Sequence, residues 1–240
     1  KLNAIGNQKS EDNYYGPWVF LYPNGVEMAK GEYLENGKKT KEWQYFYEDG
    51  TLKKKELYNG EGNLHGLLKY YYENGNIKNE IPYAEDQIDG PVNIYYSCGP
   101  LKETLVYKNG LRHGKGTTYY TSGEINSDYT YAEGELKDAF TYYYKNGNKK
   151  EVYSYVAGKL EGPYFYYHKN GQLHQRGQYK DENLAGEWLG FFEDGKDKFK
   201  GKYENGYKTG IWTYYNPDGS VSSEEVFGEE GRLSGISKYY

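Results

Sequence analysis

The four histidines are the residues of this 240-residue chain with the clearest potential for metal or acid–base chemistry. His168 and His174 flank an Asn-Gly pair, which is typical of tight turns, so they could face each other and supply two ligands to a weak metal site. His65 and His113 each precede a glycine at corresponding places in an internal repeat, two repeats apart. That separation is too large for a shared ion, and we interpret both as turn residues.

The cysteine and the carboxylates offer no better catalytic site. Cys98 occupies a turn position, with no indication of the base or cation that would activate a thiolate. A single cysteine also excludes an intramolecular disulfide, a four-cysteine zinc site and a CxxC redox centre. The pair Glu48-Asp49 and the lone Asp218 precede turn glycines, where a solvated turn accounts for them. We therefore expect a protein that is not an enzyme, with no catalytic residue, no metal and no cofactor.

The composition indicates an unusual core. Only 36% of the residues are hydrophobic, but the chain has 33 tyrosines and 4 tryptophans, and each large ring can bury about 150–250 Å². The sequence has no run of 18 apolar residues, so it predicts no membrane-spanning helix. The net charge of −5 argues against a general nucleic-acid binder. Because Lys1 is not an initiator residue, a signal peptide removed before it is one expectation for the compartment.

The dominant feature is an internal repeat of 24–25 residues, which takes precedence over other fold reasoning. Nine turn glycines mark it, mostly preceded by Asn or Asp: Gly25, Gly50, Gly75, Gly99, Gly123, Gly147, Gly171, Gly195 and Gly219. An aromatic residue follows each of them by eight positions: Tyr33, Tyr58, Tyr83, Tyr107, Tyr131, Tyr155, Tyr179, Tyr203 and Phe227. Such a constant offset indicates one structural unit repeated along the chain.

Each repeat predicts one β-hairpin. Asn-Gly and Asp-Gly favour the turns that join antiparallel strands, and the Tyr, Trp, Thr and Phe residues around them suit pleated strands. Two strands of about seven residues leave no room for a helix in a unit of this length. We therefore expect an all-β fold: an elongated single-layer antiparallel sheet of about nine hairpins. Residues 1–14 lie outside the repeat, and residues 15–240 form the repeat domain, with nine units and the start of a tenth.

Strand parity distributes the aromatic rings over both faces of the predicted sheet. One face receives the tryptophans and a row of tyrosines, and its candidate binding residues are Trp18, Trp43, Tyr72, Tyr96, Tyr120, Tyr144, Trp188 and Trp212. We call these eight residues the aromatic ladder. The opposite face receives rings such as Phe46, Tyr71 and Tyr95. Rings on both faces favour a single layer over a sandwich with one charged face. The ladder rings are either recognition anchors or contacts that hold adjacent hairpins together.

The pattern Tyr-x-x-Gly-x-x-x-Gly-x-Trp-x-x-Tyr-Tyr-x-x-x-Gly resembles the MORN repeat, in the longer variant common in bacteria. The resemblance is clearest over 203–219 and 33–50 and extends over about residues 15–240. It implies a single-layer sheet of hairpins that binds proteins or membrane lipids, and some bacterial proteins with this variant are described as antitoxins. Lys41 and Asp138 depart from the pattern because they replace a repeat glycine, while Leu68, Val92 and Gly116 replace the tryptophan.

The function we expect is that of a non-enzymatic scaffold that binds a partner protein through a Tyr/Trp-rich face, since Tyr and Trp often concentrate binding energy. An antitoxin or immunity-type role is a special case of this. The alternatives are a glycan or cell-wall module and a membrane-surface module, although the negative net charge disfavours membrane lipid. No nucleic-acid partner is expected. Self-association through the edge of the half-built last unit, 235–240, is a further expectation.

Overall fold

The predicted turns form local hydrogen-bonded loops in the computed structural model, which describes residues 3–10, 13–235 and 237–240. In the first turn, the Gly25 amide donates to the Tyr22 carbonyl oxygen at 2.9 Å, and the Tyr22 amide donates to Val26 at 2.8 Å. The Asn24 side chain accepts the Val26 amide at 3.0 Å. Gly25 has a φ of +85°, which glycine adopts at little cost. Local chemistry therefore closes each hairpin.

The chain forms two units, residues 1–123 and 124–240. The strands of unit 1 are β1 (Asn3–Ser10), β2 (Asn13–Leu21), β3 (Glu27–Tyr33), β4 (Lys39–Phe46), β5 (Leu52–Tyr58), β6 (Gly66–Tyr71), β7 (Ile77–Ala84), β8 (Gln87–Ile88), β9 (Gly90–Tyr95), β10 (Leu101–Lys108) and β11 (Leu111–Tyr119). Those of unit 2 are β12 (Ile125–Ala132), β13 (Glu135–Tyr143), β14 (Lys149–Val156), β15 (Lys159–Leu160), β16 (Gly162–Tyr167), β17 (Leu173–Lys180), β18 (Asn183–Phe191), β19 (Asp197–Glu204), β20 (Tyr207–Tyr215), β21 (Val221–Phe227) and β22 (Lys238–Tyr239). A 3₁₀ turn, η1 (Glu229–Gly231), precedes β22.

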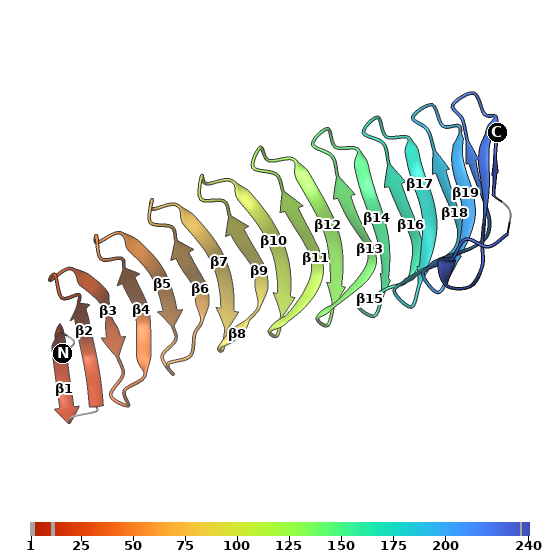
Figure 1. The fold of residues 1–240 in the computed structure, drawn as a ribbon. Helices are drawn as coiled ribbons and strands as arrows, with labels where there is room; N and C mark the ends of the chain where they lie inside the picture. Colours follow the sequence, from red (N-terminus) through yellow and green to blue (C-terminus); the bar gives the residue numbers. More distant parts are fainter. Residues whose placement is uncertain (1–2, 11–12, 236) are drawn as a thin grey trace. The chain divides into compact units, whose positions relative to one another are not determined.

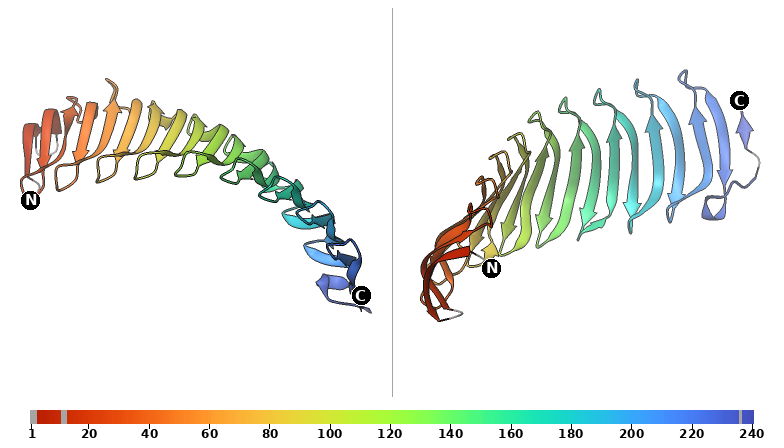
Figure 2. Two further views of the ribbon diagram at one scale, coloured as in Figure 1. Left: turned by 90° about the horizontal axis from the view of Figure 1, so that it is seen from above. Right: turned by 60° about the vertical axis from the view of Figure 1, so that its left-hand side comes forward.

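Within each unit, neighbouring strands pair antiparallel in the order of the sequence, for example β2 with β3, β3 with β4 and β4 with β5. Figure 1 and Figure 2 show these strands side by side, one layer thick. The all-β prediction of a single-layer antiparallel sheet of hairpins is confirmed. The two-residue strands β8 and β15 lie in the connections between successive hairpins, where they pair with the ends of β7 and β14. These short pairings are additional to the nine predicted hairpins. No helical segment within the described residues is long and apolar enough to cross a membrane.

The two ends of the chain also take part in the sheet. β1, which we placed outside the repeat, pairs with β2 and covers its edge, with Gly6 opposite Trp18. At the other end, Lys238 and Tyr239 of β22 pair with β21. The second contact lies on the edge for which we expected self-association, and self-association there stays a prediction.

Two departures from the repeat pattern keep the backbone of the residue they replace. Gly186 and Gly210 adopt φ values of +65° at the repeat-glycine position. Lys41 and Asp138 stand at the same position with φ values of +59° and +62°. A non-glycine side chain in this left-handed region is strained, although Asp tolerates it better than most residues. The fold therefore imposes the repeat conformation even where glycine is missing.

Candidate functional site

The four tryptophans of the aromatic ladder lie in the core of the layer. Their exposed fractions are 1% for Trp43, 2% for Trp212, 3% for Trp188 and 6% for Trp18. In unit 2, Trp188 and Trp212 form a buried cluster with Tyr164. Buried rings of this kind hold adjacent strands together and present little surface to a ligand.

Each tryptophan lies over a glycine of the preceding strand. A Cβ atom built on these glycines would lie 2.1–2.2 Å from the indole ring, in the pairs Gly6 and Trp18, Gly31 and Trp43, Gly177 and Trp188, and Gly201 and Trp212. Repeats without a tryptophan have a larger residue in the glycine position. Tyr129 stacks on Phe140 with 4.8 Å between ring centroids, and Leu105 pairs with Gly116. The two positions therefore compensate each other in volume. In the sequence, the glycine 11 or 12 residues before each tryptophan was the pattern that could have predicted this packing.

The tyrosines of the ladder tie each repeat to the next. The Tyr72 hydroxyl donates to the Tyr95 carbonyl oxygen, and the Tyr96 hydroxyl donates to that of Tyr119, both at 2.8 Å. The Tyr144 hydroxyl makes the equivalent bond in unit 2, also at 2.8 Å. Tyr120, at the same repeat position, is half-buried. The bonded hydroxyls are therefore structural, and only the ring faces and edges remain for contact with a partner.

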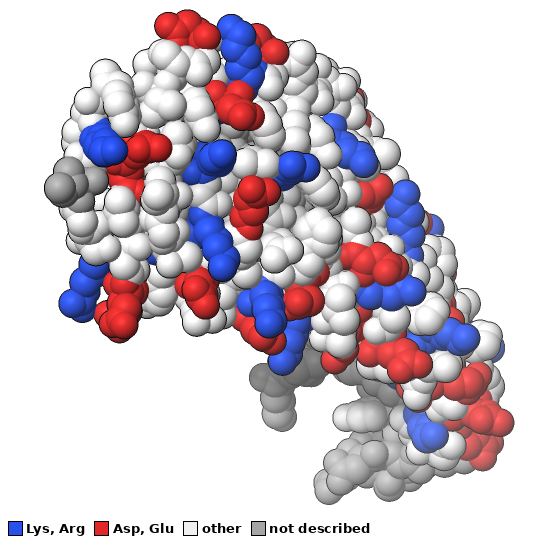
Figure 3. Space-filling model, turned by 90° about the vertical axis from the view of Figure 1, so that its right-hand side faces the viewer, with Lys and Arg blue, Asp and Glu red and all other residues white. Residues whose placement is uncertain are grey.

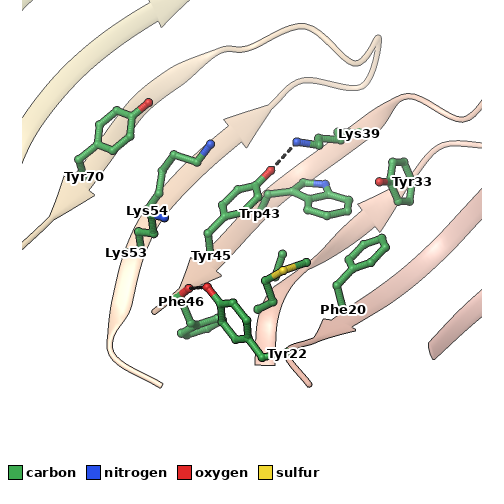
Figure 4. A pocket seen from close by; sticks show the side chains of 12 residues that line it. Phe20, Tyr22, Tyr33, Lys39, Trp43, Tyr45, Phe46, Lys53, Lys54 and Tyr70 are labelled. Atoms are coloured by element: carbon green, nitrogen blue, oxygen red, sulfur yellow. Dashed lines mark hydrogen bonds between the residues drawn. The ribbon is translucent and has the colours of Figure 1, made fainter. Parts of the chain in front are cut away.

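The accessible aromatic surface of unit 1 is instead an open groove of about 490 Å³ over β2 to β6. Its lining residues, which we call the aromatic groove, are Phe20, Tyr22, Met28, Ala29, Tyr33, Lys39, Trp43, Tyr45, Phe46, Lys53, Lys54 and Tyr70. Figure 4 shows the rings arranged around an open space, with the three lysines among them. Tyr22 lines this groove together with Trp43, which agrees with the parity prediction that the two share a face. Phe46, which we predicted on the opposite face, also lines the groove, next to the register shift between Tyr45 and Phe46. The groove combines a mainly apolar wall with positive charge.

Stacked rings connect the groove to the core beneath it. Phe20 stacks on Trp18 with ring centroids 5.7 Å apart, and Trp43 meets the edge of Tyr33 at 4.7 Å. Edge-to-face and offset contacts of this kind fix ring orientation. Phe20 and Tyr45 were not among the sequence candidates. Their alternation with Trp18 and Trp43 in β2 and β4 was the available signal.

A buried carboxylate orders two of the three lysine side chains of the groove. Glu56 accepts hydrogen bonds from Lys54 at 2.6 Å, Tyr45 at 2.6 Å, Tyr58 at 3.0 Å and Lys39 at 3.3 Å. Burial opposes ionisation of Glu56, but the bonds from Lys54 and Tyr45 and the charge of Lys39 bring its pKa below the usual value. Burial, followed by the bonded Glu56, raises the pKa of Tyr45 well above the usual range. Tyr45 and Tyr58 thus remain hydrogen-bond donors to the charged carboxylate of Glu56.

The same lysines lie over aromatic rings. The Lys54 ammonium is 4.0 Å from the centroid of Tyr45, and that of Lys39 is 4.9 Å from the centroid of Trp43. Cation–π contacts of this kind hold an ammonium in place without a second carboxylate. With Lys53 added, the groove carries three ammonium groups against the one carboxylate of Glu56. An uncompensated positive charge therefore remains at an apolar surface.

The residues first considered for chemistry are placed as follows. His168 and His174 do meet across their turn, with ring centroids 4.5 Å apart, and burial lowers the pKa of His174. His65 contacts the exposed Glu85 at 3.1 Å. Cys98 is exposed. Within the described ranges, no group of three or more His, Cys, Asp or Glu residues is placed to hold a metal ion.

Charges on the surface are mixed in sign. On the side of the molecule that Figure 3 displays, basic and acidic side chains are interspersed with each other and with uncharged surface. Surface ion pairs such as Lys41 with Glu32 at 2.7 Å are exposed, so they contribute little to stability. The aromatic groove is the best-defined candidate site among the described residues.

Three solved structures with which the chain aligns are only weakly similar to it. The chain is 18% identical to a chain of the GtfA/B complex bound to UDP and GlcNAc, covering 49% of this chain and 23% of that one with a TM-score of 0.22. It is 10% identical to a chain of the TcdB2-TccC3-Cdc42 structure, covering 87% of this chain and 14% of that one with a TM-score of 0.20. It is 10% identical to a chain of the Photorhabdus luminescens Tc holotoxin pore, covering 90% of this chain and 16% of that one with a TM-score of 0.17. This chain spans less than a quarter of each of these chains, and such TM-scores support no functional argument.

The comparison with curated proteins gives no match. A protein family does match, described as the MORN repeat variant, at residues 39–59, 64–85, 112–133, 160–181 and 208–227. These stretches lie on the hairpins of both units and start near the repeat positions found in the sequence. These family matches and the hairpin repeats of the structure together show that the chain is a MORN repeat protein, a repeat scaffold.

Proposed function

We propose that this scaffold is not an enzyme and binds a partner protein through the aromatic groove of unit 1. The observation that carries the proposal is the groove itself, which has a volume of about 490 Å³, a mainly apolar lining and three lysines at its wall. The Tyr45 ring is already oriented by its bond to Glu56, and the Tyr70 ring adds contact area to the same wall. Apolar surface left open on a protein usually marks a contact site. An antitoxin or immunity-type role would be a case in which the partner is a toxin, and it stays a prediction.

A glycan-binding role receives less support. Stacking on a sugar requires aromatic rings that lie flat and open, whereas Trp43 is 1% exposed and lies over Gly31. Trp43 also contacts the rings of Phe20, Tyr33 and Tyr45, which cover it further. A peptide segment that inserts an apolar side chain fits this surface better.

The test is selection of a displayed random peptide library against the protein, followed by affinity measurements with the selected peptides. Tyr70 and Tyr71 are adjacent in β6 and point to opposite faces, so they form a matched pair. We expect Tyr70→Ala, in the groove, to weaken binding about ten-fold or more, as for an interface aromatic whose truncation costs at least about 1.4 kcal/mol. Tyr71→Ala should leave the affinity unchanged.

Circular dichroism and urea unfolding of both variants establish that each remains folded under the binding conditions. Failure to enrich any peptide, or enriched peptides that bind Tyr70→Ala as tightly as the wild type, would contradict the proposed function.

A further inference from the structure

One lysine position recurs beside the hairpin tyrosines of unit 1. It stands three residues after the turn glycine, and its ammonium lies over the tyrosine ring that ties one repeat to the next. The contacts are Lys53 over Tyr47 at 5.4 Å, Lys78 over Tyr72 at 5.6 Å and Lys102 over Tyr96 at 5.8 Å from ammonium to ring centroid. We call these three residues the lysine row. Because each ring is fixed by its hydroxyl bond, each ammonium is held at a regular position.

The lysine row presents uncompensated charge to solvent. All three side chains are exposed, and none forms an ion pair with an acidic side chain of the described residues. Lys69, on the neighbouring strand, behaves differently because it pairs with Glu80 at 2.8 Å. An ammonium already held over a ring loses little side-chain entropy when it meets an anion. The row is therefore suited to bind negative groups.

The spacing of the row indicates what kind of anion fits. Successive members are one hairpin apart, and two strands at about 4.8 Å each give about 10 Å between ammonium groups. A polyproline II chain has three residues per turn and a rise of about 3.1 Å, so every third side chain returns to the same side after about 9.3 Å. A carboxylate at every third residue of such a chain would meet each lysine in turn.

The row is continuous with the aromatic groove, because Lys53 belongs to both. We propose that the aromatic groove and the lysine row together bind an acidic, extended segment of a partner protein. An apolar side chain of this segment enters the groove, and carboxylates at every third residue meet Lys53, Lys78 and Lys102. This inference rests on the proposed function and specifies the chemistry of the partner.

Unit 2 lacks such a row among its described residues. At the equivalent position, Lys150 has a carboxylate neighbour, Glu151, at 3.9 Å, and the next repeat has His174. Lys198 follows, and its ammonium lies 5.8 Å from the centroid of Phe192. Lys198 therefore has the same local contact as a member of the row but no row around it, which makes it the matched control.

The experiment uses a fluorescein-labelled peptide, Phe-Pro-Glu-Pro-Pro-Glu-Pro-Pro-Glu, with its ends blocked. A peptide of the same composition with the three glutamates in succession is the spacing control. Fluorescence anisotropy measures the affinity of the whole chain for both peptides at low and at physiological salt. We expect the spaced peptide to bind about ten-fold more tightly, with an affinity that falls as salt rises.

Variants of the chain then test the row itself. Lys53→Gln, Lys78→Gln and Lys102→Gln should each weaken the spaced peptide about two- to five-fold, the range of an exposed charge contact. Lys198→Gln should leave its affinity unchanged. Equal binding of both peptides, or equal effects of Lys78→Gln and Lys198→Gln, would overturn the inference.

The outcomes separate this inference from the proposed function. If the spaced peptide does not bind but library-selected peptides still depend on Tyr70, the groove function stands and the acidic partner does not. If Tyr70→Ala leaves the selected peptides unaffected, the proposed function itself fails. Phosphatidylcholine vesicles containing phosphatidylserine serve as the other probe. Row-dependent binding of these vesicles without binding of the spaced peptide would assign the row to a lipid surface and overturn the peptide proposal.

Discussion

A Cβ atom on Gly31 would lie 2.2 Å from Cδ2 of Trp43, so the indole ring occupies the space that any other residue would need. The relationship recurs at all four tryptophans, and the repeats without tryptophan have a side chain in the place of the glycine. The pairing therefore sets how closely β3 and β4 approach in a layer that has no second sheet to cover it.

Gly31→Ala should destabilise the protein by about 1–3 kcal/mol, the usual cost of overpacking a filled core. Gly60→Ala is the control, because a Cβ atom there has no neighbour within 4 Å and the backbone is not left-handed. That variant should change the free energy of unfolding by no more than about 0.5 kcal/mol. Urea unfolding followed by tryptophan fluorescence measures both, and equal stability of the two variants would show that the ring moves aside without cost.

Asp138→Gly should stabilise the protein. Asp138 has a φ of +62° at a position where other repeats have glycine, and its exposed contact with Lys137 at 3.6 Å contributes little. Relief of the left-handed strain should add about 1 kcal/mol to the free energy of unfolding. Asp138→Ala is the control, since alanine tolerates this conformation less well than aspartate and should destabilise. Thermal unfolding in which both variants shift the midpoint in the same direction would refute the strain argument.

Tyr47→Phe removes the hydroxyl that donates to the Tyr71 carbonyl oxygen at 2.9 Å and keeps the ring. We expect a loss of about 1 kcal/mol, because the carbonyl group is left without that partner. Tyr207→Phe is the matched change at an exposed ring, which is 53% accessible, and it should be neutral. Chemical denaturation of the two variants side by side provides the measurement. A neutral Tyr47→Phe would mean that the hydroxyl bonds do not tie the repeats together.

The carboxylate of Glu56 predicts a stability that depends on pH. Its pKa is lowered from the usual 4.5, so its contribution is fully present above that value and is lost as the pH falls through the lowered pKa of the folded state. Glu56→Gln should cost about 1–3 kcal/mol at pH 7, because the partners Lys54, Tyr45 and Lys39 lose a charged acceptor. The difference from the wild type should shrink toward pH 3.

Melting temperatures of wild type and Glu56→Gln at pH 7, 5 and 3 test this dependence. Glu73→Gln, at an exposed turn, serves as the control for loss of a surface carboxylate. A gap between wild type and Glu56→Gln that stays constant down to pH 3 would show that the charge of Glu56 does not stabilise the fold.

The hairpin repeat follows from the sequence because its determinants are local. Asn24-Gly25 and its equivalents specify turns within four residues, and the aromatic residue eight positions later lies on the strand that the turn begins. Side-chain alternation then places Trp18 and Phe20 on one face of the same strand. The period, the strand order and the all-β class depend on nothing farther away than the next repeat, so they could be predicted without coordinates.

The tertiary structure decided which rings are buried and which line a site. Trp43 is covered because a glycine 12 residues earlier makes room for it, and this depends on the register between β3 and β4. A register shift between Tyr45 and Phe46 leaves Lys53 between the paired residues of β5, beside the groove, which simple alternation does not predict. Glu56 gathers lysines and tyrosines from β4 and β5 only once these strands pair. Burial and charge pairing depend on several strands at once, whereas turn chemistry depends on four residues of one chain segment.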